Sequence, residues 1–238
     1  MKKIMLLCTM VLVALCANAQ IVRSRTIVKE KSQTMWYGRI GMSFNNIAGG
    51  NDYAEGYKTS YSEATIRPKV GMNLDFGFHK PIGKSGTYWG MELGIGTRGG
   101  SFKESYDGYG SEISSITTWN VKYSPFTFGY KYSITDDLKL DAHIGAYVSY
   151  DFAGKGKTKF EDDDDVSSTL GELADDYDYQ RFDAGMQIGI GAWWKRFNID
   201  FTYQRGFVPC ANVEDYIDWH KDYNLTSSNF SIRLGYAF

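Results

Sequence analysis

Bulky and small or polar side chains alternate through most of this chain, and the last eleven residues show the pattern most clearly. The bulky residues of segment 228–238 share one parity: Phe230, Ile232, Leu234, Tyr236 and Phe238. The other parity holds an arginine among small or polar residues: Asn229, Ser231, Arg233, Gly235 and Ala237. A helix would scatter both sets around its circumference, whereas a strand places each set on one face. The pattern therefore predicts a strand with one apolar and one polar face, as in a soluble sandwich or a membrane barrel.

The same period of two recurs in seven earlier segments, so the chain is expected to contain eight strands. We predict strands over residues 36–45, 70–79, 88–97, 119–132, 138–150, 181–194, 197–204 and 228–238. The connections alternate between short turns and long polar segments. The long segments are expected to be loops, at about 46–67, 99–115, 153–178 and 206–226.

The fourth predicted strand changes phase in its middle. Trp119 and Tyr123 share one parity, whereas Phe126 and Phe128 share the other, and Ser124-Pro125 stands at the switch. An extra residue in a β-bulge flips the parity, and proline is tolerated there because a bulge need not donate a ladder hydrogen bond. Two separate strands would leave no room for a turn, so we predict one bulged strand.

The content of the polar face distinguishes a membrane barrel from a soluble fold. A soluble sandwich or lipocalin would carry many lysines and glutamates on its outer face, whereas the polar parity here is rich in glycine, as a crowded small lumen requires. The sequence predicts an all-β protein, an eight-stranded antiparallel up-and-down transmembrane β-barrel, with Ile144 and Ile188 facing lipid. Aromatic residues expected in girdles near the strand ends are Trp36, Trp89, Tyr123, Tyr132, Tyr150, Trp194, Tyr236 and Phe238.

The first residues resemble an export signal. Lys2 and Lys3 precede an apolar core, residues 4–16, and Ala17-Asn18-Ala19 supplies the small residues of a signal-peptidase site. We predict a signal peptide over 1–19, cleaved after Ala19, a periplasmic lead-in over 20–34 and a barrel domain over 35–238 in the outer membrane. A lipoprotein using Cys16 is disfavoured because bulky Leu15 fits a lipobox poorly.

After cleavage, the composition argues against several kinds of function. Cys210 is the only cysteine of the mature chain, which predicts no internal disulfide and no cysteine metal cluster. Loss of Lys2 and Lys3 leaves 24 basic against 28 acidic residues, a net charge of −4, which does not suggest nucleic acid as a partner. We expect no cofactor.

Charged residues on the polar parity are predicted to form a network in the lumen. The network is expected to contain Arg39, Asp75, Glu92, Lys131, Lys139, Asp141, His143, Arg181, Asp183, Asp200 and Arg233. Its ten formal charges balance, five against five, and an eight-stranded barrel is only just wide enough for side chains to fill. Paired side chains filling the lumen, rather than an ion-selective channel, are therefore predicted.

The long loops offer candidates for recognition at the outer rim. Tyrosine and tryptophan among glycine, serine and asparagine give adaptable surfaces for protein or sugar ligands, although such residues can equally pack on one another and on lipopolysaccharide. The candidates are Tyr57, Tyr61, Tyr106, Tyr109, Tyr216, Trp219 and Tyr223. The acidic segment 161–178 either binds divalent cations or is a solvated loop, and it lacks EF-hand spacing.

The three histidines are candidates for a lipid-modifying site. His143 is expected in the lumen beside Asp141, and His79 near a periplasmic turn, both far from the outer leaflet. His220 lies in the last outer loop near Ser227, but no nucleophile motif surrounds it. We therefore predict no catalytic residues and no enzyme activity, with a lipid-A-modifying enzyme and a small-solute pore as alternatives.

Four segments of the chain carry a resemblance to a known family: the signal ending Ala-Asn-Ala-Gln, Tyr123-Ser124-Pro125-Phe126, Phe182-Asp183-Ala184-Gly185, and the terminal Gly235-Tyr236-Ala237-Phe238. Together they resemble the PorT-like outer-membrane β-barrel family of Bacteroidetes, with a strand count as in small OmpX-like barrels. The resemblance implies insertion by the barrel-assembly machinery and no catalytic residues; only some relatives act in secretion. We expect a monomer that contacts outer-membrane lipid and lipopolysaccharide, with a role in envelope integrity or recognition of an extracellular protein or glycan.

Overall fold

The computed structural model describes residues 33–49, 62–106, 110–160, 165–176, 179–210 and 225–238. The elements are β1 (Met35–Ala48), β2 (Ser62–Arg67), β3 (Lys69–Pro81), β4 (Thr87–Tyr106), β5 (Gly110–Ser133), β6 (Leu138–Phe160), β7 (Val166–Thr169), α3 (Leu170–Asp176), β8 (Phe182–Trp194), β9 (Phe197–Pro209) and β10 (Thr226–Ala237). Among these residues, no helix is long and apolar enough to cross a membrane.

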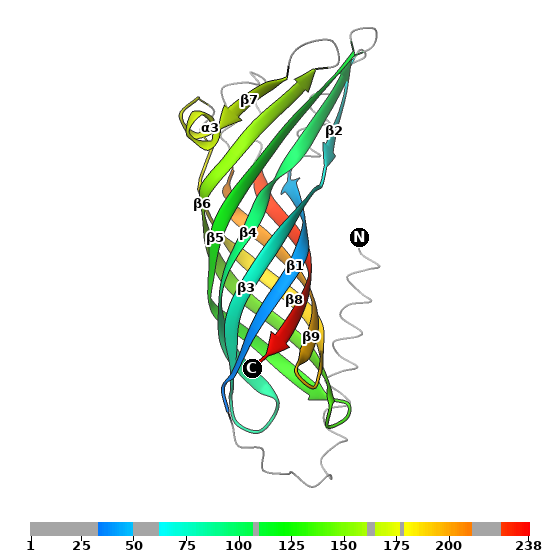
Figure 1. Ribbon diagram of the computed structural model, residues 1–238, viewed down its shortest axis with the longest axis vertical. Helices are drawn as coiled ribbons and strands as arrows, with labels where there is room; N and C mark the ends of the chain where they lie inside the picture. The colour runs from blue at the N-terminus through cyan, green and yellow to red at the C-terminus, as the bar shows by residue number, and fades with distance from the viewer. Residues whose placement is uncertain (1–32, 50–61, 107–109, 161–164, 177–178, 211–224) are drawn as a thin grey trace. The chain divides into compact units, whose positions relative to one another are not determined.

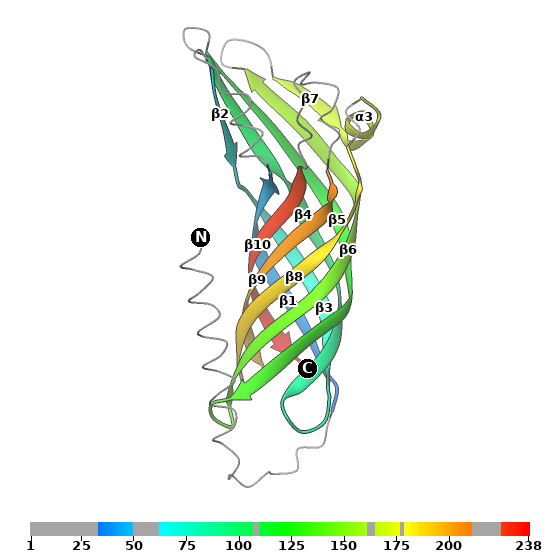
Figure 2. The ribbon, with the colours of Figure 1, turned by 180° about the vertical axis from the view of Figure 1, so that it is seen from behind.

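Eight strands close into a single antiparallel ring (Figures 1 and 2). Around the ring they follow the order β1, β3, β4, β5, β6, β8, β9 and β10. The ring closes where β1 pairs with β10, from Tyr37–Ala237 to Ala48–Thr226. Each other ring strand pairs with the ring strands before and after it in the chain. The predicted eight-stranded antiparallel up-and-down barrel is confirmed.

The apolar parity faces outward along the ring. Ile144 is 45% exposed and Ile188 is 56% exposed, while their paired inward neighbours are buried: His143 is 5% exposed and stands opposite Gly189. The outer surface is therefore a band of aliphatic and aromatic side chains, and the interior is polar. This confirms the predicted orientation of the two faces.

Three neighbouring strands continue beyond the rest of the ring. β4, β5 and β6 have 20, 24 and 23 residues, against 12 to 14 in the other ring strands. Beyond the ring, β2 pairs with the free side of β4 and β7 with that of β6. We call this end of the barrel, at the top of Figure 1, the extended end, and the opposite end, with the short connections at 82–86, 134–137 and 195–196, the turn end.

The extension corrects the predicted loops. Residues 99–106 and 110–117 pair as a hairpin from Gly99–Thr117 to Tyr106–Gly110, β6 continues to Phe160, and segment 62–67 is strand β2. Segment 165–176 contributes β7 and α3. Serine, threonine and glycine occupy both faces of these strands, so the sequence lacks the apolar period that identifies a strand. The pairing itself continues because the backbone ladder needs no particular side chain.

The predicted bulge in β5 is present. Tyr123 pairs with Val148 and the next pair is Phe126–Ala146, so β5 has one residue more than β6 across the Ser-Pro step. Phe126 and Phe128 are consequently exposed on the outer face although their parity differs from that of Tyr123. The prediction of one bulged strand is confirmed.

Glycines on the inner face provide room for large polar side chains. A Cβ at Gly94 would collide with the carboxylate of Asp75, and a Cβ at Gly189 would collide with the imidazole of His143. A Cβ at Gly129 would meet the ring of Tyr88. In each case the colliding side chain belongs to the residue paired with the glycine on the neighbouring strand, so the glycines leave room for large polar side chains of the adjacent strand to lie along the inner face.

Candidate functional site

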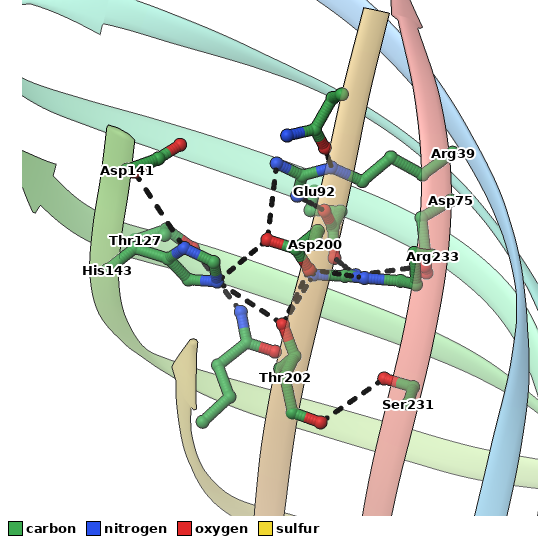
Figure 3. A network of polar contacts seen from close by, with 12 residues as sticks. Arg39, Asp75, Glu92, Thr127, Asp141, His143, Asp200, Thr202, Ser231 and Arg233 are labelled. Carbon is green, nitrogen blue, oxygen red and sulfur yellow. Dashed lines mark hydrogen bonds and ion pairs between the residues drawn. The ribbon is translucent and has the colours of Figure 1, made fainter. Parts of the chain in front are cut away.

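Arg233 of β10 lies at the centre of a buried ionic cluster in the lumen (Figure 3). Its guanidinium nitrogens lie 3.0 Å from Asp75 of β3, 2.8 Å from Glu92 of β4 and 2.6 Å from Asp200 of β9. Nη2 also donates a hydrogen bond to Thr202 Oγ1 at 2.9 Å. One side chain therefore connects carboxylates from three other strands.

Two more cations complete this group. Nη1 of Arg39 lies 3.0 Å from Glu92, and Nη2 lies 3.7 Å from Asp200. Nζ of Lys122 lies 3.1 Å from Asp75 and 3.8 Å from Glu92. The three carboxylate side chains are at most 3% exposed. We call the six residues the central ionic cluster: Arg39, Asp75, Glu92, Lys122, Asp200 and Arg233. Three positive charges face three negative charges, which is the arrangement that makes burial of ions tolerable.

His143 lies beside the central ionic cluster. Its Nε2 is 3.4 Å from Thr202 Oγ1 and 3.8 Å from Asp200, and its Nδ1 is 3.9 Å from Asp141 (Figure 3). Gln187 and Gln204 are also buried in the lumen and bond to each other, Nε2 of Gln204 to Oε1 of Gln187 at 2.8 Å. The imidazole is thus enclosed by polar groups.

An aromatic layer fills the lumen nearer the turn end. Tyr88 Oη and Trp193 Nε1 donate to Asp141 at 2.8 and 2.9 Å. Lys131 Nζ lies 5.0 Å from the ring centre of Tyr88 and 4.6 Å from that of Trp193, and the His79 ring lies 4.0 Å from that of Tyr88. Buried rings and one cation thus close this part of the interior.

A second ionic group lies toward the extended end. Arg98 of β4 reaches Asp151 of β6 at 2.7 Å and Asp183 of β8 at 3.2 Å. Tyr179 Oη donates to Asp151 at 2.7 Å, and Tyr147 Oη donates to Asp183 at 3.1 Å. One arginine thereby joins three strands where β8 begins and β6 continues into the extension.

A small polar cavity separates the two ionic groups. Its volume is about 40 Å³, with Asp75 and Lys122 among its walls on one side and Arg98 and Asp183 on the other. Amide and hydroxyl side chains make up most of the remaining lining. Such a space suits a few water molecules hydrogen-bonded to polar walls.

The structure places the predicted lumen residues in three locations. Those that lie in or directly beside the ionic groups are Arg39, Asp75, Glu92, Asp141, His143, Asp183, Asp200 and Arg233. Lys131 lies in the aromatic layer instead. Lys139 and Arg181 are half-buried near strand ends, and the Arg181 carbonyl accepts from the backbone N–H of Asp151.

Among the described residues, three charged side chains of the central ionic cluster and the second ionic group were not predicted: Arg98, Lys122 and Asp151. Lys122 alternates with Val121 and Tyr123, so its inward direction was available from the period of two. Arg98 and Asp151 continue the inward parity of β4 and β6 past the points where those strands were expected to end. Because β4 and β6 are longer than predicted, the second ionic group was not predicted from the sequence.

The recognition candidates of the long connections remain predictions. Tyr57, Tyr61, Tyr109, Tyr216, Trp219 and Tyr223 lie outside the described residues, as do His220 and most of the acidic run 161–165. Tyr106 ends β4, and its side chain also lies outside what is described.

The geometry defines a class of protein: a closed β-barrel with an apolar exterior and an interior filled by paired charges and aromatic rings. Among the described residues, no group of three or more His, Cys, Asp or Glu side chains is arranged to hold a metal ion. A polar interior inside an apolar wall is the arrangement of a barrel whose solvent is lipid.

Comparison with known proteins identifies the family. Residues 18–212 match the model of the outer membrane protein beta-barrel domain, and the chain belongs to this family, whose members reside in the outer membrane. No curated protein matches the chain. Solved structures with a similar barrel include Ail, the attachment invasion locus protein of Yersinia pestis, in complex with the heparin analogue sucrose octasulfate (15% identity, 87% of this chain and 99% of that chain, TM-score 0.38). Neisserial surface protein A is 9% identical, with 85% of this chain and 97% of that chain covered and a TM-score of 0.37. The N-terminal barrel domain of OprF from Pseudomonas aeruginosa is 8% identical, with 87% of this chain and 100% of that chain covered and a TM-score of 0.30.

Proposed function

We propose that this protein is a non-enzymatic, non-conducting outer-membrane barrel that serves envelope integrity or surface recognition through the strands and connections of its extended end. The central ionic cluster is the observation that carries this proposal. Charged side chains from β1, β3, β4, β5, β9 and β10 meet in it within ion-pair distance. Charges paired across a narrow lumen leave no continuous path for solutes.

Successive segments of the chain are proposed to direct its export and its insertion into the membrane. Residues 1–19 would direct export and be cleaved after Ala19, residues 20–34 would form a periplasmic lead-in, and residues 35–238 would be inserted as a monomer by the barrel-assembly machinery. With the lead-in before β1 in the periplasm, the turn end would face the periplasm and the extended end would lie outside the cell. Membership of the PorT-like branch is part of the same proposal.

The extended end is proposed to contact lipopolysaccharide and an extracellular protein or glycan. The extended sheet of β4, β5 and β6, flanked by β2 on β4 and by β7 on β6, provides a rigid base for the aromatic residues predicted in the adjoining connections. Sites carried on strands are held more accurately than sites on loops alone. Ail is a barrel crystallised with a sulfated sugar analogue, and a glycan is one partner to test here.

The absence of enzyme activity is proposed from the location of the two histidines that the structure describes and from the lack of a nucleophile motif around His220 in the sequence. His79 and His143 are buried in the lumen, where outer-leaflet lipid does not reach. Mass spectrometry of lipid A from a strain lacking this chain tests the alternative: an altered acylation or phosphorylation pattern, restored by complementation, would contradict the proposal.

Single-channel recording tests the closed lumen. The wild-type protein, reconstituted in planar bilayers, is expected to give no stable conductance, because the central ionic cluster and the aromatic layer both fill the lumen. A stable, wide conductance in the wild type would refute the proposed role and favour a pore. Envelope fractionation with heat-modifiability on gels, followed by a pull-down with surface-displayed protein, tests location and partner.

A further inference from the structure

Exposed charge at the turn end is unevenly distributed. The β3–β4 connection and its flanks carry Lys80 and Lys84, and the β8–β9 connection consists of Lys195 and Arg196, all four exposed. The β5–β6 connection alone is acidic, with two exposed carboxylates, Asp136 and Asp137. Among the described residues of these three connections, cations therefore outnumber anions.

Beside the β8–β9 connection lies a continuous surface of aromatic rings, which we call the aromatic shelf: Trp194, Phe197, Tyr236 and Phe238. The ring centres of Trp194 and Phe197 are 6.4 Å apart, those of Phe197 and Tyr236 are 5.4 Å apart, and those of Tyr236 and Phe238 are 5.8 Å apart. All four side chains are exposed on the outward face. Amphipathic rings in this position mark the boundary between acyl chains and headgroups.

Both cations of the β8–β9 connection are placed over the aromatic shelf. Lys195 Nζ lies 5.7 Å from the ring centre of Trp194 and 3.7 Å from Asp137. Arg196 Nη1 donates to Tyr236 Oη at 3.5 Å, and its carbonyl accepts from the backbone N–H of Ala237 at 2.8 Å. Among the described residues, Arg196 forms no ion pair, so its guanidinium can accept an anion.

We propose that the β8–β9 connection binds the phosphate group of an anionic phospholipid, with Lys195 and Arg196 on the phosphate and the aromatic shelf against the acyl chains. A guanidinium offers two parallel N–H donors to phosphate oxygens, and an adjacent ammonium adds a point charge. The combination of basic groups directly over an apolar aromatic surface matches a lipid, which is anionic at one end and apolar along its length. The inference rests on the proposed function, because that function puts the turn end at the inner leaflet.

Quenching of tryptophan fluorescence by brominated lipids tests the proposal. The mature chain is folded into phosphatidylcholine vesicles that contain one fifth phosphatidylglycerol, with bromine on the acyl chains of one lipid or the other. A basic side chain near an anionic surface corresponds to about a five-fold enrichment per charge. We expect brominated phosphatidylglycerol to quench more per lipid than brominated phosphatidylcholine, and a variant with Lys195→Gln and Arg196→Gln to lose most of this difference.

The matched control replaces two exposed lysines of the extended end, Lys155→Gln and Lys159→Gln, and should retain the difference. Equal quenching by the two lipids in the wild type would overturn the proposal, and so would a loss of the quenching difference in the control variant as large as in the variant with Lys195→Gln and Arg196→Gln. Neither result would contradict the proposed location of the barrel in the membrane. A chain that stays in the supernatant and shows no heat-modifiability would overturn the proposed function and this inference together.

Discussion

At the scale of single residues, the interior depends on charges that compensate one another. Arg233 contacts three carboxylates and is 1% exposed. Arg233→Ala would leave buried negative charge with too few partners, which costs about 3–5 kcal/mol. We expect the urea midpoint of the vesicle-inserted protein to fall accordingly, whereas Lys159→Ala, at an exposed position, should change the free energy of unfolding by less than about 0.5 kcal/mol. Equal midpoints for the two variants would show that the cluster does not stabilise the barrel.

Glycine provides a second test at this scale. Gly189→Ala would drive a methyl group into the imidazole of His143, and overpacking of this kind costs about 1–3 kcal/mol. Gly38→Ala on β1 is the control, because its Cβ would meet only ordinary contacts, the nearest at 3.9 Å. The urea midpoint of unfolding should be lower for Gly189→Ala than for Gly38→Ala. A stable Gly189→Ala protein would mean that the inner wall has more room than the side-chain positions imply.

At the scale of elements, the bulge in β5 sets which face of the strand is apolar. Deleting Pro125 would shift the second half of the strand by one residue, which turns Phe126, Phe128 and Tyr130 from lipid into the polar lumen. We expect the deletion to abolish heat-modifiability on gels. Pro125→Ala keeps the residue count and should preserve it. A folded deletion variant would indicate that the strand changes its register with β6.

At the scale of the whole molecule, the location of the ion pairs predicts how the protein responds to salt. The central ionic cluster is buried, and buried pairs are screened much less than exposed ones. We expect the urea midpoint to change little between about 0.1 and 1 M sodium chloride, where the Debye length falls from about 10 to 3 Å. The preference for phosphatidylglycerol, which depends on exposed Lys195 and Arg196, should fall over the same range. A midpoint that drops steeply with salt would place the stabilising charges at the surface.

The alternation of side chains by itself determined the strand count, the bulge and which face is apolar, because the period of a strand is a local property of the backbone. It also placed Arg39, Asp75 and Arg233 on the inner face. Pairs that span the seam were decided only by closure of the ring at β1 and β10, which brings Arg39 to Asp200 and Arg233 to Asp75. The extension of β4, β5 and β6 beyond the ring was likewise a tertiary outcome: its residues have no apolar period, and their pairing depends on strands already aligned by the barrel below.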